Sequence, residues 1–209
     1  MRSFKQCLDF LYTKLPMYQR VGPAALKKDL GNIKKLCILL GNPEQKFLSV
    51  HIAGTNGKGS VTHMMAAALV NSNLKVGIYT SPHYLDFRER IKINNQLIPK
   101  KTVTRFVREH KKIIQEIKPS FFEITVAMAF HYFAQEEVDI AIIETGLGGR
   151  LDSTNVISPL LSVITNISLD HQPMLGNTLK KIAAEKAESL KRIFPLSSVK
   201  NNQRSHPFF

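Results

Sequence analysis

HIAGTNGKGS, at residues 51–60, indicates the end of a strand, a glycine turn and the start of a helix. The apolar run at 47–52 is typical of a buried strand, and the small residues at 61–70 are typical of a helix. Glycines let backbone N–H groups close around an anion, a helix N-terminus adds partial positive charge, and Lys58 adds a full one. This stretch therefore predicts a phosphate-binding loop.

The loop meets the usual P-loop pattern only in part. Gly54, Gly57 and Lys58 fit the pattern, but Ile52 stands where it needs Gly. Gly59 replaces the usual Ser or Thr, and the hydroxyl comes one position later, at Ser60. A glycine turn without a ligand is the alternative, but a lysine and a hydroxyl at the start of a helix favour phosphate. The predicted phosphate-binding residues are Gly54, Thr55, Asn56, Gly57, Lys58, Gly59 and Ser60.

The composition is typical of a globular protein. The chain has 209 residues, of which 44% are hydrophobic, which suits one domain or slightly more. The sequence has no apolar run of the roughly 20 residues that a membrane span needs, and its first residues lack the apolar core of a signal peptide. Cys7 and Cys37 match no metal or disulfide pattern and are expected to be reduced thiols. We therefore expect a cytoplasmic protein without a membrane partner.

The net charge of +13 raises the question of nucleic-acid binding. The basic residues are spread along expected helices, and no arginine-rich or aromatic-interleaved cluster stands out. Anionic small substrates and a solvated basic face account for the excess. We expect no nucleic-acid partner.

Strand patterns alternate with helix patterns along the chain, which predicts an α/β fold with a mostly parallel sheet flanked by helices. A short hairpin at 91–98 is expected to lie over the functional site. The expected strands span 47–52, 76–80, 139–143 and 160–167, and the expected helices span 1–15, 30–40, 61–70, 102–118, 121–133 and 178–187.

Polar residues follow the ends of four expected strands: Lys58 and Ser60, Ser81 and His83, Glu144, and Asp170 and His171. The carboxyl ends of parallel strands meet at one edge of a sheet, where ligands bind in open α/β folds. The Glu144 carboxylate and the Ser81 hydroxyl suit Mg²⁺, which takes oxygen ligands, whereas His171 is a less usual ligand. The alternatives are a helix cap or salt bridge for Glu144 and a structural role for His171. Convergence of the strand ends favours a site.

Four blocks of sequence together resemble a known enzyme family. They are HIAGTNGKGS (51–60), YTSPHYLDFRERI (79–91), ETGLGGRLDSTNV (144–156) and TNISLDHQPMLGNTLKKIAAEKA (165–187). Their order and spacing resemble those of the folylpolyglutamate synthase and dihydrofolate synthase branch of the Mur ligase superfamily. The resemblance covers residues 18–187 and implies a P-loop fold of the Mur ligase central-domain type.

The resemblance implies an ATP-dependent amide ligase. The carboxylate of dihydropteroate or a tetrahydrofolate would take the γ-phosphoryl group of ATP, and the amino group of L-glutamate would then displace phosphate. Residues 54–60 would bind ATP, and Lys58, Lys186 and His171 would be catalytic. Ser81 and Glu144 would hold one Mg²⁺ and His171 a second. Lys186 aligns with a lysine that is carbamylated in the family.

The resemblance also implies a folate-binding wall. Phe121 and Phe122 would stack on the pterin ring, and plain core packing is the alternative for both. The family is mostly monomeric, so a monomer is expected. The implied substrate-binding residues are Pro82, His83, Ser120, Phe121, Phe122, Glu123, Leu151, Asp152 and Ser153.

The chain departs from the family at its C-terminal end. Family members are about twice as long and have a second, C-terminal domain that contributes to the glutamate site. The resemblance stops at Ala187, and residues 188–209 lack the glycine and the Ile-Pro-Val-Val strand of the family. Inserting one G after a GCA codon for Ala187, with the other codons chosen from the degenerate set, gives GVIKKNIPVVISEKQPEVTPVF. This suggests an incomplete ATP-binding domain at 1–187 and an out-of-frame tail at 188–209.

An incomplete domain would have an unpaired sheet edge and an uncovered apolar surface. We therefore expect weak or absent ligase activity for this chain alone. Two other functions stay open from the sequence. One is a nucleotide-binding fragment without ligase activity, and the other is a related Mur-type ligase acting on a cell-wall precursor.

Overall fold

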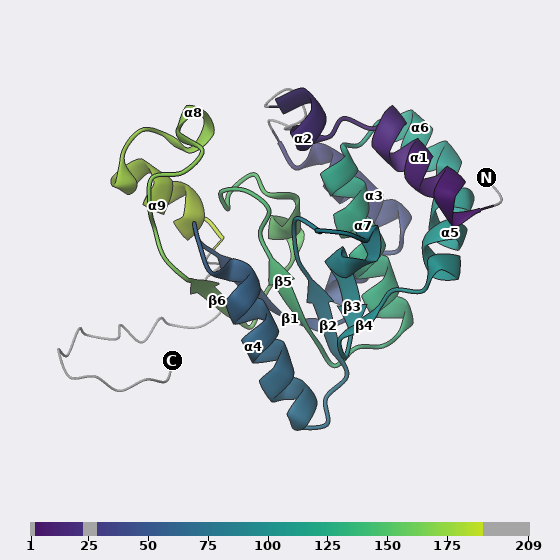
Figure 1. The fold of residues 1–209 in the computed structure, drawn as a ribbon, viewed down its shortest axis with the longest axis horizontal. Coiled ribbons are helices and arrows are strands. Elements are labelled where there is room, and N and C mark those ends of the chain that lie inside the picture. The colour runs from purple at the N-terminus through teal and green to yellow at the C-terminus, as the bar shows by residue number, and fades with distance from the viewer. Residues whose placement is uncertain (1–2, 23–28, 190–209) are drawn as a thin grey trace.

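The computed structural model describes residues 3–22 and 29–189 (Figure 1). Its six strands form one sheet in the order β4-β3-β2-β5-β1-β6. The pairs β2–β5, β5–β1 and β1–β6 are parallel, whereas β3 is antiparallel to both β2 and β4. The strands are β1 (Leu48–Ala53), β2 (Val76–Tyr79), β3 (Ile91–Ile93), β4 (Gln96–Leu97), β5 (Ile140–Glu144) and β6 (Leu161–Ile164). The predicted mostly parallel α/β sheet is confirmed.

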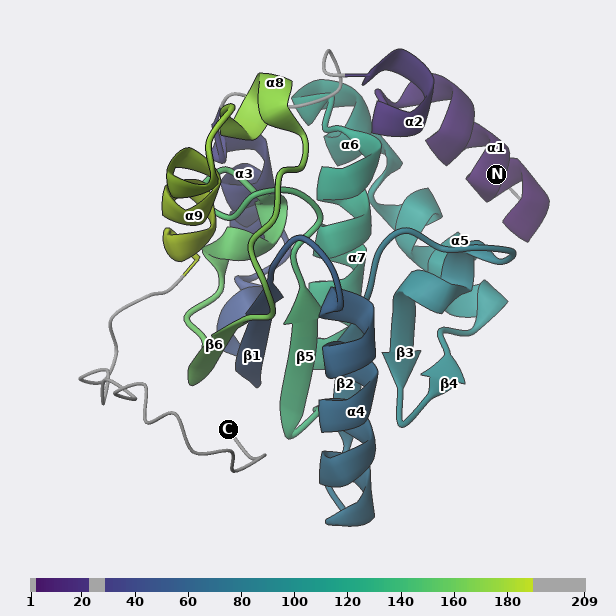
Figure 2. The same cartoon turned by 60° about the vertical axis from the view of Figure 1, so that its left-hand side comes forward.

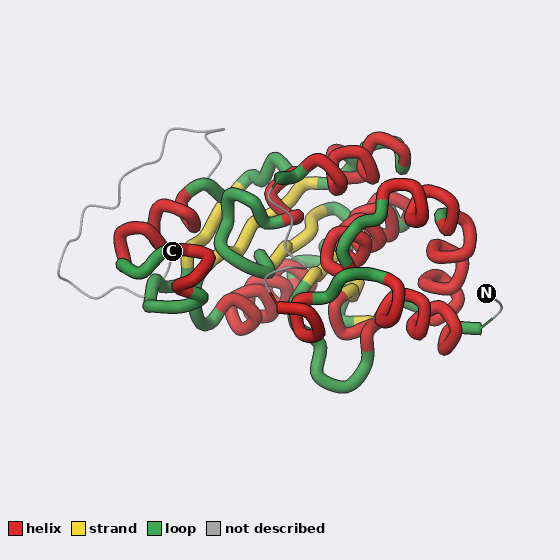
Figure 3. The backbone as a smooth tube through the Cα atoms, turned by 90° about the horizontal axis from the view of Figure 1, so that it is seen from above, coloured by secondary structure: helices red, strands yellow, loops and turns green. Residues whose placement is uncertain are grey.

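Helices cover both faces of the sheet (Figures 2 and 3). Helix α4 packs on one face, and α7, α3 and α1 lie on the other. The helices are α1 (Phe4–Lys14), α2 (Tyr18–Val21), α3 (Gly31–Leu39), α4 (Lys58–Asn71), α5 (Lys100–Glu109), α6 (Lys111–Ile117), α7 (Phe121–Gln135), α8 (Gln172–Leu175) and α9 (Leu179–Ala187). Short 3-10 turns span Pro43–Gln45, Phe87–Arg90 and Ser153–Val156. No helix in the described part of the chain is long and apolar enough to cross a membrane.

Alternation along the central strands divides the core between the two faces. Ile142 of β5 belongs to the cluster under α4, whereas Ala141 and Ile143 belong to the larger cluster under α7. This is the period of two that a strand buried on both faces must show. Helix α7 is apolar nearly all round, because it lies between the sheet and the helices α1, α3 and α5.

Three expected elements differ in the structure. The 91–98 hairpin forms β3 and β4 at the edge of the sheet instead of covering the site, because β3 pairs with β2. The expected helix 102–118 is two helices, α5 and α6, which meet at His110. The His110 ring Nδ1 bonds the carbonyl oxygen of Phe106 (2.9 Å), which also accepts the His110 backbone N–H. Helix α4 begins at Lys58, three residues before the expected start.

Strand β6 is the other edge of the sheet. Leu160 and Leu161 at its start are each 49% exposed. The Ser162 hydroxyl donates to the carbonyl oxygen of Ser189, at the end of the described chain. Most of the expected out-of-frame tail, residues 190–209, lies outside the described residues.

Candidate active site

A cavity of about 550 Å³ lies at the carboxyl ends of the parallel strands. Its wall takes residues from the loops after β1, β2, β5 and β6, from the start of α7 and from α9. Of the sequence-predicted site residues, fourteen line it: Gly54, Thr55, Lys58, Ser81, Pro82, Ser120, Phe121, Phe122, Glu123, Leu151, Asp152, Ser153, His171 and Lys186. Of the polar residues expected at the strand ends, Lys58, Ser81, Asp170 and His171 meet at this cavity.

Six predicted residues stand outside the cavity wall. Asn56 and Gly57, before α4, and Ser60, in its first turn, are exposed, and Gly59 is also in that first turn. Glu144 does not line the cavity. Its carboxylate is near the start of α4, because a Cβ at Gly59 would lie 3.7 Å from Glu144 Oε2. The sixth is His83.

The phosphate-binding loop folds back on its own lysine. Lys58 Nζ donates to the carbonyl oxygens of Gly54 (3.0 Å) and Thr55 (3.2 Å). Gly57 is in the left-handed region at the N-cap position, and no side chain in the described residues caps α4. Gly54 has φ +144°, and a Cβ there would collide with the side chain of Thr165 at 1.9 Å. Only glycine therefore fits where the loop passes the end of β6.

A second lysine reaches the same carbonyl oxygen. Lys186, on α9, is 2% exposed, and its Nζ donates to Gly54 O at 2.9 Å. Burial, and then the nearby Lys58 charge, lower the pKa of Lys186. Gly149 lets this happen, because a Cβ there would lie 2.6 Å from the carbonyl oxygen of Glu185 and would push α9 away. Two lysines that share one acceptor make this end of the cavity suited to an anion.

Glu144 is a buried carboxylate with few partners. It is 4% exposed, and its Oε2 accepts the Ser81 backbone N–H at 3.2 Å. Burial raises the pKa of Glu144 to about 7, and the Ser81 N–H and the Lys58 charge only partly oppose this. A cation beside this carboxylate would favour its charged form. The described residues contain no group of three or more His, Cys, Asp or Glu that could hold a metal by themselves.

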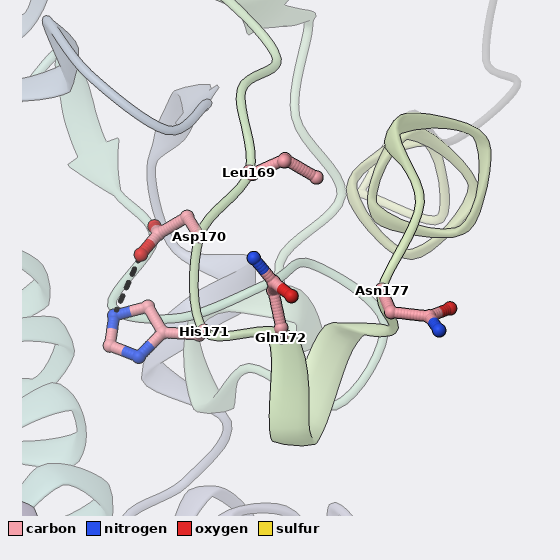
Figure 4. Close-up of a pocket in the computed structure, with 5 residues that line it drawn as sticks. All are labelled: Leu169, Asp170, His171, Gln172 and Asn177. Atoms are coloured by element: carbon pink, nitrogen blue, oxygen red, sulfur yellow. Dashed lines mark ion pairs between the residues drawn. The ribbon is translucent and has the colours of Figure 1, made fainter.

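His171 lies where the chain turns from β6 toward α8. Its φ of 43° is in the left-handed region, and its Nε2 lies 3.5 Å from Asp170 Oδ1 (Figure 4). Its ring contacts Tyr18 edge-on, with ring centroids 5.9 Å apart. Both His171 and Asp170 also line an open depression on the outer side of this loop. We assign the chemistry to the cavity, because Lys58 and Lys186 lie there.

The predicted folate wall contains a helix cap and two different phenylalanines. Ser120 and Glu123 form a capping box at the start of α7, in which each side chain accepts the other residue's backbone N–H (3.2 and 2.6 Å). Phe121 is a core residue that stacks on Tyr12. Phe122 is only half-buried and packs against Gly146, where a Cβ would lie 2.4 Å from its ring. Of the two rings, Phe122 is the more accessible.

Arg90 takes the place in the wall that the sequence suggested for His83. Arg90 is buried, lines the cavity and lies over the Phe121 ring at 5.2 Å. Its Nε donates to His83 Nδ1 (2.7 Å), and His83 Nε2 bonds the Tyr12 hydroxyl (3.2 Å). His83 therefore positions Arg90 instead of reaching the cavity. Sequence reasoning also missed Tyr18, Arg150 and the aliphatic Met174 and Leu175.

Comparison with known proteins agrees with this geometry. The family model described as the Mur ligase middle domain matches residues 52–198, which is more than half of the chain. A dihydrofolate synthase/folylpolyglutamate synthase of Bacillus subtilis is 44% identical over 178 residues, covering 82% of this chain and 41% of that protein.

Solved structures show the same relationship. The folylpolyglutamate synthase of Thermotoga maritima superposes with a TM-score of 0.79 and 40% identity, covering 90% of this chain and 42% of that one. FolC of Escherichia coli, in complex with DHPP and ADP, gives a TM-score of 0.81 and 30% identity, covering 90% and 44%. The chain spans less than half the length of each relative. With a family match over more than half of its residues, the chain belongs to the Mur ligase family, whose middle domain it carries.

Proposed function

We propose that this chain is the ATP-binding part of a ligase that joins L-glutamate to dihydropteroate or a folate. The observation that carries the proposal is the Lys58 ammonium group, which the Gly54 and Thr55 carbonyl oxygens hold beside the uncapped start of α4. The Lys58 ammonium group and a helix N-terminus together match a polyphosphate. The Bacillus subtilis and Thermotoga maritima relatives are named as synthases of this kind, and the FolC structure holds ADP.

The reaction has two displacements. An oxygen of the substrate carboxylate attacks the γ-phosphorus of ATP, and the bond from that phosphorus to the β-phosphate oxygen breaks. ADP departs, and the substrate becomes an acyl phosphate. The glutamate amine then attacks the acyl carbon, phosphate leaves, and the amine loses a proton. Lys58 would leave the Gly54 and Thr55 carbonyls and donate to the phosphoryl group, where it stabilises developing charge. The aromatic wall at Phe122 would receive the pterin ring.

Magnesium fits the donors that the structure offers. Ser81 and Glu144 would hold one Mg²⁺ and His171 a second, with phosphate oxygens and water as the other ligands, and the two ions would neutralise phosphate charge. The fit rests on Glu144, a buried carboxylate whose pKa burial raises although the Ser81 N–H and the Lys58 and Arg90 charges oppose this.

We also propose that Lys186 is carbamylated. Its buried amine has a lowered pKa and lies near the Lys58 charge, and both features favour the neutral, nucleophilic form. The Nζ lone pair would form a bond to the carbon of CO2, one N–H proton would pass to solvent, and a carbamate anion would result. Protein incubated with ¹³C-bicarbonate should show a carbamate carbon signal by NMR that Lys186→Met lacks. An identical spectrum for the two proteins would contradict the modification.

Nucleotide binding tests the proposed function first. Isothermal titration of the 209-residue chain should detect MgATP, and Lys58→Met should weaken it by about tenfold to a hundredfold, because charge-assisted hydrogen bonds are lost. Lys75→Met is the matched control, since Lys75 is exposed beside Glu136 and far from the cavity wall. Absence of MgATP binding to the wild type, or equal binding by Lys58→Met, would overturn the proposal.

Ligase turnover is the second test. Phosphate release that depends on both glutamate and dihydropteroate or tetrahydrofolate distinguishes this function from a nucleotide-binding fragment. A UDP-muramyl peptide in place of the pterin tests a cell-wall substrate. We expect turnover to be weak, because the chain spans less than half of its relatives. We further propose a monomeric cytoplasmic protein without a nucleic-acid partner, and gel filtration with and without DNA checks the monomer and the absence of binding.

A further inference from the structure

A buried chain of hydrogen bonds links the strand before the phosphate loop to the opposite wall of the cavity. His51, on β1, is fully buried, and its Nε2 lies 2.8 Å from the Thr154 hydroxyl. The Thr154 hydroxyl and backbone N–H both donate to Asp152 Oδ1, at 2.5 and 2.9 Å. The second carboxylate oxygen, Oδ2, accepts the backbone N–H groups of Gly146 (2.8 Å) and Leu147 (2.7 Å).

The donor and acceptor in each of these hydrogen bonds follow from the chemistry of the groups. Burial raises the pKa of Asp152, but the hydrogen bonds from Thr154, Leu147 and Gly146 oppose this and favour the ionised form. An ionised carboxylate only accepts hydrogen bonds, so the single hydroxyl proton of Thr154 points to Asp152. The Thr154 oxygen must then accept from His51, and His51 therefore carries a proton on Nε2. Four donors meet the Asp152 carboxylate, so it serves as a brace within the wall.

The brace ends on a part of the wall that the pterin substrate would touch. Gly146 and Leu147 line the cavity, and Gly146 packs directly on the Phe122 ring. The phosphate end, at Lys58, belongs to a different loop that holds its own lysine. Loss of one of these hydrogen bonds would therefore let Gly146 and the Phe122 ring shift, while the loop that holds Lys58 keeps its position.

We propose that His51 is a positioning residue that, through Thr154 and Asp152, sets the place of Gly146 and Leu147 and thereby the affinity for the ring-bearing substrate. A buried histidine that only fills space among apolar residues is the alternative. The inference rests on the proposed function for the identity of its ligand, whereas the brace itself can be measured without a ligand.

Matched variants separate the two roles. In His51→Gln the side-chain amide nitrogen can take about the place of Nε2, whereas in His51→Asn it falls short of Thr154. Thr154→Ser keeps the hydroxyl, and Thr154→Val removes it with little change of shape. Hydrogen exchange in the full 209-residue chain should be about tenfold faster at Gly146 and Leu147 in His51→Asn and Thr154→Val, because one hydrogen bond of the chain is lost.

The conservative variants His51→Gln and Thr154→Ser should exchange at the wild-type rate. The double variant His51→Asn with Thr154→Val should exchange no faster than either single variant, since both interrupt the same chain. Equal acceleration by His51→Gln and His51→Asn, or no acceleration by His51→Asn, would overturn the proposal. If Thr154→Val fails to fold, the His51 pair decides the matter alone.

Ligand titration supplies the functional half of the test. Affinity for dihydropteroate should fall about tenfold in His51→Asn and recover in His51→Gln, while MgATP affinity stays within about twofold of wild type. Unchanged dihydropteroate affinity in His51→Asn would overturn the inference and leave the proposed function standing. A wild type that binds neither ligand would refute the proposed function and the claim about substrate affinity, while the exchange rates would still decide whether the brace exists.

Discussion

Helices α4 and α7 both begin at the cavity, and their first turns are built in opposite ways. Helix α7 starts with a closed capping box, in which the side chains of Ser120 and Glu123 accept backbone N–H groups. Helix α4 starts after Gly57 in the left-handed region, and no side chain in the described residues caps it. The first arrangement stabilises the protein without a ligand, whereas the second leaves helix donors suited to a phosphate.

The same contrast separates two buried glutamates. Glu123 accepts the Ser120 N–H at 2.6 Å and completes the cap of α7. Glu144 accepts one N–H at 3.2 Å, and burial raises its pKa to about 7. One carboxylate is placed for stability. The other is placed where its charge is costly unless a cation binds, which is the usual compromise at a functional site.

The largest expected effect contrasts the cores beneath the two helices. Phe130 of α7 is fully buried against Phe47, so Phe130→Ala should lower the free energy of unfolding by about 3–5 kcal/mol. Leu69 of α4 is only partly buried, so Leu69→Ala should cost about half as much. Urea denaturation of the two variants measures this. Equal losses would show that the α4 face is as tightly packed as the α7 face.

Glu144→Gln is expected to stabilise the chain, by an amount that depends on pH. The pKa of Glu144 is near 4.5 in the unfolded chain and about 7 in the folded one, so the folded state binds its proton more tightly. The free energy of unfolding is therefore highest below pH 4.5 and declines as the pH rises to 7. Glutamine removes this loss, so the variant should gain up to about 3 kcal/mol at pH 8 and nothing at pH 4, from 1.36 kcal/mol per pKa unit. Urea denaturation at both pH values, without magnesium, measures the gain.

Glu123→Gln is the matched control for that prediction. It removes a charge that belongs to the cap of α7, so it should lower stability at pH 8, the opposite sign to Glu144→Gln. If both variants stabilised the protein, the assignment of Glu123 to the helix cap and of Glu144 to a functional role would be contradicted. The MgATP affinity of Glu144→Gln should also fall, whereas that of Glu123→Gln should not.

The sequence predicted the α4 side of this contrast best. Glycines, lysine and polar residues recur at the ends of apolar runs in the sequence. From these local patterns we predicted that Lys58, Ser81 and His171 lie at one site, and all three line the cavity. The sheet and its parallel strands followed from the same alternation. The same strand-end pattern put Glu144 among the expected magnesium ligands, although its carboxylate lies near the start of α4 and does not line the cavity.

The features that the sequence did not predict depend on distant contacts. His83 was expected in the wall, but Tyr12, 71 residues away, bonds its ring, and Arg90 lines the cavity instead. The hairpin at 91–98 joins the sheet because β2 offers an open edge, which no local pattern reveals. The brace from His51 to Gly146 crosses from β1 to the loop after β5, so its partners are far apart in the sequence.

The smallest expected effect tests the cap of α7 itself. Ser120→Ala removes the acceptor for the Glu123 N–H and should lower the free energy of unfolding by about 1 kcal/mol. MgATP affinity should stay unchanged, because the phosphate end of the cavity lies at α4. Urea denaturation and isothermal titration check the two expectations. Ser120 also lines the cavity, so a variant that keeps its stability but loses dihydropteroate affinity would show that the hydroxyl serves the substrate and not the helix.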